Sequence, residues 1–204
     1  MYSKAEIYNL AAGALLLTKQ IIDVDNDKSK ECLVFNIHWN TALQTALQDM
    51  DLDSTSSQKD LELLEVDPNS LWKYAYKYPT KCSFFRRIQN SALRDQRSNQ
   101  IAKRVGIHND KKVIFTNQEN AVAEFISIDV PLATLSANAG MAIAYKLAFL
   151  STSLLTGKAA KELKKEIKGL YDLAVIEAQE HDRRENANFE TDEEMSEFVE
   201  ARMS

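Results

Sequence analysis

The chain begins with two stretches in which apolar residues recur at helical spacing. In the first, Ser3 and Glu6 form a capping-box pattern, and the apolar positions that follow predict a helix to about Lys19. The second stretch begins near Ser29 and runs to about Met50. Its predicted buried stripe consists of Cys32, Phe35, Asn36, Trp39, Ala42, Leu43, Ala46, Leu47 and Met50. Two amphipathic helices in tandem predict one half of a helical bundle.

Helical spacing is lost between residues 54 and 130. A polar segment at 54–57, a short apolar stretch at 61–66 and a turn at 67–70 come first. After them, short segments rich in aromatic and β-branched residues predict five strands, at 72–78, 82–88, 101–107, 112–116 and 122–126. This region therefore reads as a small inserted β-rich module.

Helical spacing returns at Pro131, and an apolar stripe from Leu135 to Leu150 predicts a third helix, which Gly157 ends. A fourth helix is predicted from about Lys158 to Glu180. Its inward-facing positions are expected to be Leu163, Ile167, Leu170, Leu173, Ala174 and Ala178.

The last segment is polar and acidic, with a net charge of -6 over residues 185–204. It has too few apolar residues to fold alone, so it is either disordered or ordered by a partner. Five apolar side chains are spaced along it and would anchor a docking arm, namely Phe189, Met195, Phe198, Val199 and Met203. The candidate residues of the portal-docking arm are Phe189, Met195, Phe198, Val199 and Arg202. The alternative is a plain frayed terminus.

Taken together, the pattern predicts an α+β fold, namely an antiparallel four-helix bundle with an inserted small β-rich module and an extended C-terminal arm. Residues 1–53 would form the first helix pair, 54–130 the module, 131–181 the second helix pair and 182–204 the arm.

Composition adds further limits. The chain has 204 residues and a net charge of -5, so no global basic field would draw it onto nucleic acid. Its two cysteines form no disulfide framework, which fits an intracellular, reducing origin. The N-terminus lacks the pattern of a signal peptide. Residues 132–155 are too polar for a bilayer span, so no membrane partner is expected.

No catalytic motif emerges. Gly157 and Lys158 lack the first glycine and the hydroxyl residue of a phosphate-binding loop. The acidic turns at 23–27 and 49–53 fail as calcium loops. His38, His108, Cys32 and Cys82 lack metal-ligand spacing, and no strained nucleophile turn occurs. We therefore expect no enzyme, no cofactor and no metal; a hydrolase or metal enzyme remains a weak hypothesis.

The charge map is more informative than the motifs. Residues 81–112 carry a net charge of +7, whereas residues 49–67 carry -6. The basic strands could face nucleic acid, or they could face an acidic surface such as 49–67 or the tail of a neighbouring copy. The acidic total favours contacts between proteins. The candidate interface residues are Arg86, Arg87, Arg94, Arg97, Lys103 and Arg104.

The layout resembles a known family. Its most specific part is the segment LWKYAYKYP at 71–79, followed by CSFFRRI at 82–88; the helix with AYKLA at 144–148 and the NLAAGA stretch at 9–14 also fit. The sequence resembles the head-to-tail adaptor of short-tailed phages, the tail tubular protein A family, over nearly its whole length.

The resemblance implies a structural virion protein, made in the host cytoplasm and located at the head-tail junction. Such adaptors form a dodecameric ring of copies below the portal protein and present a platform to the tail nozzle, often also to fibres or spikes. They continue the channel for genomic DNA, which passes during ejection without specific binding. By this resemblance the arm would dock on the portal and residues 71–127 would form the distal platform. The alternative function is a nucleic-acid-binding module that uses 81–112.

Overall fold

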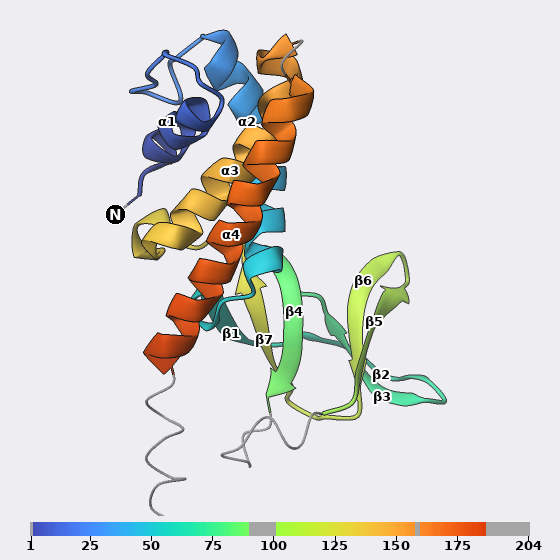
Figure 1. Ribbon diagram of the computed structural model, residues 1–204. Helices are drawn as coiled ribbons and strands as arrows, with labels where there is room; N and C mark the ends of the chain where they lie inside the picture. Colours follow the sequence, from blue (N-terminus) through green and yellow to red (C-terminus); the bar gives the residue numbers. More distant parts are fainter. Residues whose placement is uncertain (1, 90–100, 158–159, 187–204) are drawn as a thin grey trace, which may run out of the picture. The chain divides into compact units, whose positions relative to one another are not determined.

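A computed structural model describes residues 2–89, 101–157 and 160–186 (Figure 1). The chain forms two compact units. The first, here the helical unit, combines residues up to Ser54 with those from Pro131 onward, and the second, the β unit, comprises Thr55–Val130. Candidate residues Arg94 and Arg97, and the five candidate arm residues, lie outside the described residues.

Within its described residues the helical unit contains four α-helices and a 3₁₀ turn. They are α1 (Lys4–Ala14), α2 (Lys30–Met50), η2 (Leu132–Thr134), α3 (Ala137–Leu155) and α4 (Ala160–Asn186), and a further 3₁₀ turn, η1 (Asp53–Thr55), marks the exit to the β unit. None of the helices in the described part of the chain is long and apolar enough to span a bilayer.

The predicted start of α1 is confirmed. The Ser3 hydroxyl accepts a hydrogen bond from the Glu6 amide at 3.2 Å, and the Glu6 carboxylate accepts one from the Ser3 amide at 2.6 Å. Ser29 caps α2 in a similar way through the amide of Cys32.

The predicted end of α1 at Lys19 is wrong, because the helix stops at Ala14. Leu16 adopts the left-handed conformation, with φ of 57°, and turns the chain. The loop is then fixed by Asn9, whose side chain donates to the carbonyl of Ile21 and accepts from its amide, both at 2.8 Å. Leu15 and Ile21 are buried although they are not helical.

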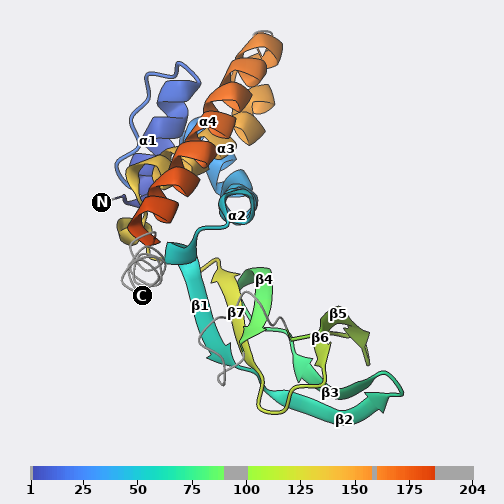
Figure 2. The same cartoon turned by 60° about the horizontal axis from the view of Figure 1, so that its bottom comes forward.

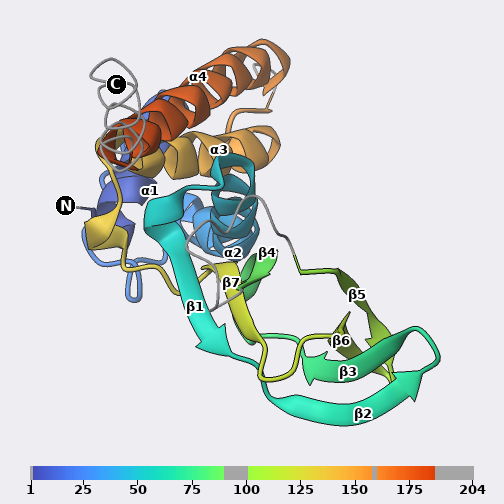
Figure 3. The ribbon, with the colours of Figure 1, turned by 90° about the horizontal axis from the view of Figure 1, so that it is seen from below.

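The expected four-helix bundle is also wrong, although the α+β class is right. Instead of four helices around a shared core, α3 lies at the centre and the other three helices pack against it. Figures 1 and 3 show α3 between α2 and α4, and these two helices meet near the C-terminal end of α2. The short α1, of 11 residues, packs mainly on α3.

The composition of α3 explains its central place. Its buried positions include many small residues, which let neighbouring helices approach from several sides. The buried residues of α3 are Ala139, Gly140, Ala142, Ile143, Ala144, Leu147, Ala148, Ser151 and Thr152. A helix that is apolar on most of its circumference belongs at the centre of a helical unit rather than at one corner of a bundle.

The β unit contains two antiparallel sheets (Figure 2). One sheet has the order β1-β7-β4 and the other β2-β3-β6-β5. The strands are β1 (Ser56–Asp60), β2 (Leu63–Asn69), β3 (Trp72–Lys77), β4 (Cys82–Gln89), β5 (Lys103–His108), β6 (Lys111–Thr116) and β7 (Val122–Ser127). The five predicted strands are confirmed as β3 to β7 within about two residues, whereas β1 and β2 were missed.

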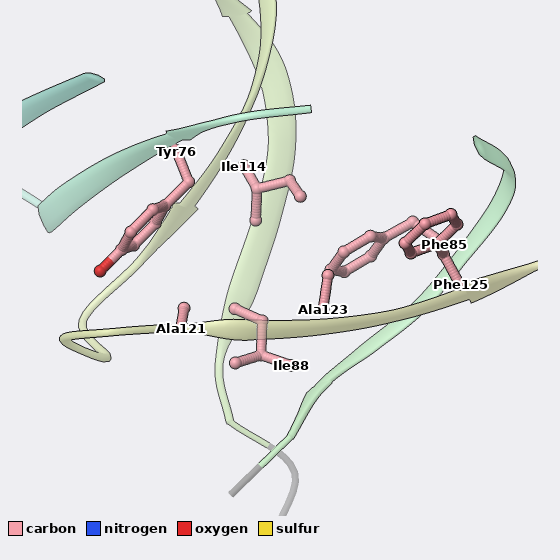
Figure 4. Packing of buried hydrophobic residues seen from close by; sticks show 7 residues of the cluster. All are labelled: Tyr76, Phe85, Ile88, Ile114, Ala121, Ala123 and Phe125. Atoms are coloured by element: carbon pink, nitrogen blue, oxygen red, sulfur yellow. The ribbon is translucent and has the colours of Figure 1, made fainter. Parts of the chain in front are cut away.

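The core of the β unit lies where the two sheets contribute to one cluster. Tyr76 and Ile114 are cross-strand partners in the four-stranded sheet, so their side chains share a face. Figure 4 shows them gathered with Phe85, Ile88 and Phe125 of the other sheet. The opposite face of the four-stranded sheet carries a smaller cluster of Ala75, Val113 and Phe115.

Helix α4 continues through Asp182 to Asn186, so the segment expected as an arm begins within a helix. Asp182 is buried, and its carboxylate accepts hydrogen bonds from the amides of Asp53 at 2.8 Å and Ser54 at 3.1 Å. These amides lie where the chain leaves the helical unit. Asp182 therefore belongs to the fold, and any arm starts after Asn186.

Candidate functional site

Two of the candidate basic residues, Arg86 and Arg87, point to one carboxylate. Glu124 lies on β7 next to β4 and is 4% exposed. Arg87 donates to its two oxygens at 2.8 Å and 3.2 Å, and Arg86 lies 3.5 Å from Glu124 Oε1. Gln89 adds a contact at 3.4 Å. This is an internal ion cluster that joins β4 to β7.

The titration of Glu124 reflects the cluster. Burial alone would raise the pKa of its carboxyl, but the hydrogen bonds from Arg87 and Gln89 and the charges of both arginines outweigh burial and lower it. Glu124 is therefore ionised, and it neutralises positive charge that the sequence pattern assigned to the surface.

Lys103 is also used inside the β unit. Its ammonium group lies 4.3 Å from the centre of the Phe85 ring and donates a hydrogen bond to the carbonyl of Arg86. Burial lowers the pKa of Lys103. This lysine therefore stabilises the packing between β5 and β4.

Arg104 is the one candidate among the described residues that is exposed. It lies on β5, an edge strand of the four-stranded sheet, in the cross-strand pair with Phe115. Lys111 pairs with His108 at the turn end of the same hairpin and is exposed too. The β5–β6 hairpin therefore presents exposed basic side chains, whereas Arg86 and Arg87 pair with Glu124.

The acidic turns have structural partners. The Asp23 carboxylate accepts hydrogen bonds from the amides of Asp25 and Asn26 and from the Asn26 side chain, and Asp27 accepts one from the Ser29 amide. These hydrogen bonds lower the pKa of both carboxyls. The turn thus leads the chain into α2.

The histidines and cysteines lie apart. Cys32 is buried in α2 and donates to the Val24 carbonyl, whereas Cys82 contacts the Tyr78 hydroxyl at 3.2 Å. His108 contacts the Glu65 carboxylate at 2.6 Å. Over residues 2–89, 101–157 and 160–186, no three His, Cys, Asp or Glu side chains are grouped to hold a metal ion.

A second polar network lies in the helical unit. The Asp49 carboxylate of α2 accepts a hydrogen bond from the Tyr171 hydroxyl at 2.6 Å and lies 3.3 Å from Lys146 Nζ. Gln179 donates to the carbonyls of Asp49 and Met50. Three helices are thus joined at the C-terminal end of α2, which makes this network structural.

The most distinctive surface feature is one that sequence reasoning missed. Leu170 and Leu173, predicted to face inward on α4, are 39% and 53% exposed, and Ile176 beside them is 53% exposed. The buried face of α4 instead follows Ile167, Tyr171, Ala174, Ala178 and Asp182. A buried stripe that includes Tyr171 instead of Leu170 places these three aliphatic side chains on the outer side of the helix.

Helix α2 has a similar outward face. Leu33 is 52% exposed and Ile37 is 70% exposed, one helical turn apart, and Ile22 in the preceding loop is 84% exposed. Helix α3 lies between α2 and α4 (Figure 3), and each apolar face is on the side of its helix away from that helix's buried residues. The two faces are therefore separate surfaces of the helical unit. Contiguous exposed apolar side chains of this kind mark surfaces for other molecules.

In comparison with known proteins, the chain matches no family model and no curated protein. The case for a function therefore rests on its own residues and surfaces.

Proposed function

We propose that the protein is a structural assembly protein of the head-to-tail adaptor class, which forms a ring of identical copies between the portal and the tail nozzle of a short-tailed phage. The observation that carries this proposal is a pair of exposed apolar faces on two different helices of the helical unit, at Leu33 and Ile37 of α2 and at Leu170, Leu173 and Ile176 of α4. Two different faces on one chain suit head-to-tail contacts between copies, which generate rings when the rotation closes.

The basic residues are in keeping with this role. Arg86, Arg87 and Lys103 interact with groups of their own unit, and the chain as a whole carries a net charge of -5. A channel through which DNA slides is served by surfaces without strong phosphate clamps. The resemblance of the segments at 71–79 and 82–88 to the adaptor family supports the same assignment.

The proposal includes a C-terminal arm that docks on the portal and orders there. Because α4 extends to Asn186 and Asp182 holds the amides of Asp53 and Ser54, the informative truncation removes residues 187–204 and leaves α4 intact. We expect the truncated protein to keep its fold, as measured by circular dichroism and thermal unfolding, and to lose binding to the portal.

The assembly itself is tested by mixing the purified full-length chain with the portal protein of the same phage. Native mass spectrometry and negative-stain electron microscopy should show the chain as a monomer or weak oligomer alone and as a ring on the portal. A chain that neither self-associates nor binds the portal at micromolar concentrations would refute the adaptor assignment. A truncated chain that docks as well as the full-length protein would refute the arm alone.

A further inference from the structure

The outward face of α4 has a continuous seam at heptad spacing. Its positions recur every three or four residues on the side away from buried Ile167 and Ala174. The seam consists of Glu162, Glu166, Gly169, Leu173, Ile176 and Glu180. The side chains at its glutamate, leucine and isoleucine positions are all exposed.

Gly169 lies in the middle of this seam, where a glycine is unfavourable for the helix. A glycine inside a helix costs about 1 kcal/mol relative to alanine. Apart from its own helix backbone, a Cβ atom at this position would have no atom of residues 2–89, 101–157 and 160–186 within 4 Å, so packing among these residues does not require the absence of a side chain. A glycine on a seam allows the backbone of another helix to approach closely.

The outward face of α2 has matching spacing. Lys30, Leu33, Ile37 and Asn40 recur three or four residues apart and are exposed. When α2 is laid antiparallel on α4, Leu33 faces Ile176 and Ile37 faces Leu173. In that register Lys30 faces Glu180, and Asn40 faces Gly169. Every apolar position thus meets an apolar one, and the one lysine meets a glutamate.

The parallel arrangement fits less well. With Ile37 again opposite Leu173, Leu33 would face Gly169, and Ile176 would face the polar Asn40. Two aliphatic side chains would lose their apolar partners, so the pattern of the seams selects the antiparallel arrangement.

Charges at both ends agree with the antiparallel register. The N-terminal end of α2 follows the acidic loop with exposed Asp23 and Asp25, and the C-terminal end of α4 carries exposed Arg183 and Arg184. At the other end, the acidic segment from Asp49 to Asp53 would meet the lysine-rich start of α4. Complementary charges of this kind select partner and register.

We infer that α2 of one copy packs antiparallel on α4 of the next copy, with Leu33 against Ile176 and Ile37 against Leu173. This inference rests on the proposed assembly function and names the contact between its subunits. The two faces belong to different helices, and both are exposed on the sides away from the buried residues of those helices. They are therefore not joined within one chain. Each copy therefore offers one face to each of two neighbours, a heterologous contact.

Disulfide trapping tests the contact directly. Leu33→Cys and Ile176→Cys are made as separate single variants, and the two proteins are oxidised alone and after mixing. We expect covalent dimers in the mixture and few in either variant alone. A chain that carries both substitutions should form a ladder of dimers, trimers and larger species on a non-reducing gel.

The controls separate the alternatives. The unsubstituted protein measures the background from Cys32 and Cys82, and the pair Leu33→Cys with Gly169→Cys reports the parallel register. If either single variant forms covalent dimers on its own in the same yield as the mixture, the contact is symmetric and the inference is overturned. Stronger crosslinking of the Gly169 pair would also overturn it.

Charge reversal gives a second readout that does not depend on thiols. Lys30→Glu should lower self-association by about three-fold or more, since it places two glutamates together, and the double variant with Glu180→Lys should restore it. The double variant Lys30→Glu with Glu162→Lys is the matched control, and its self-association should stay low. If rings form on the portal but the cysteine pair does not crosslink and the charge pair does not change self-association, the proposed α2–α4 contact is wrong and the assembly function stands. If no rings form, both the contact and the assembly function are refuted.

Discussion

Tyr171 on α4 donates a hydrogen bond of 2.6 Å to the carboxylate of Asp49 on α2. Lys146 of α3 reaches the same carboxylate oxygen and also lies 4.5 Å from the centre of the Tyr171 ring. The three side chains thus connect three helices at the point where α2 ends. Because the tyrosine is buried, its hydroxyl needs this partner.

Tyr171→Phe should therefore destabilise the helical unit by about 1.5–3 kcal/mol, the usual contribution of a hydrogen bond to a charged group. Urea unfolding followed by circular dichroism at 222 nm measures the change. Asp49→Asn in the wild-type and Tyr171→Phe backgrounds completes a double-mutant cycle. Additive effects of the two substitutions would mean that the contact contributes nothing to stability.

The same contact makes stability depend on pH in the alkaline range. Burial, followed by the hydrogen bond and charge of Asp49, raises the pKa of Tyr171 well above the ordinary value of a tyrosine, about 10. The folded state thus binds the phenolic proton more tightly than the unfolded state does. The stabilisation is complete below pH 10 and is lost as the pH rises beyond it. The difference in unfolding free energy between wild type and Tyr171→Phe should shrink over that range; a constant difference would contradict the assignment.

Gly140 of α3 makes room for Tyr2. A Cβ atom at position 140 would lie 2.2 Å from the ring of Tyr2, whose hydroxyl donates a hydrogen bond to the Ala137 carbonyl. Gly140→Ala should displace the ring and destabilise the helical unit by about 1–3 kcal/mol. In a Tyr2→Ala background the same substitution should be neutral or stabilising, since alanine favours a helix. Thermal unfolding of the four proteins tests this, and equal effects in both backgrounds would contradict it.

The sequence pattern predicts some of these features and not others, for physical reasons. The capping box at Ser3 and the strands from β3 to β7 are local, so their signals lie within a few residues. In contrast, β1 reads SSQKD and is a strand because β7 pairs with it, and β2 contains Pro68 and is exposed almost throughout. Neither has the alternation that marks a strand.

Tertiary contacts also decide which way helices face. The path of the chain after α1 depends on the Asn9 side chain, which hydrogen-bonds the backbone of Ile21. In the sequence, Asn9 cannot be told from any other polar residue of a helix. Leu170 and Leu173 of α4 were predicted to be buried because leucine is usually a core residue. The exposed positions Leu173 and Ile176 follow from the burial of Tyr171, which sets the orientation of α4. Arg86 and Arg87 looked like surface charge because Glu124 is more than thirty residues away.

Glu124→Gln should destabilise the β unit by about 2–3 kcal/mol, because it removes the buried carboxylate charge that pairs with Arg87 and with the largely buried Arg86. Near-ultraviolet circular dichroism reports the loss of packing around Phe85 and Phe125. Since the folded state lowers the pKa of Glu124, the stability from this group is fully present above the ordinary pKa of a glutamate, about 4.3, and is lost as the pH falls through the lower folded pKa. Glu119→Gln, at an exposed position, is the matched control and should change stability by less than about 0.5 kcal/mol.

Arg87→Ala and Arg104→Ala separate a structural role from a nucleic-acid interface. Arg87 is neutralised by Glu124, whereas Arg104 is exposed. We expect Arg87→Ala to lower the melting temperature and Arg104→Ala to leave it unchanged. Neither should alter binding to duplex DNA at low salt, because an adaptor lets DNA pass without holding its phosphates. Fluorescence anisotropy with labelled DNA over a salt series measures this. A wild-type affinity that falls steeply with salt, with a slope reduced by about one in Arg104→Ala, would instead assign the β5–β6 hairpin to nucleic-acid binding.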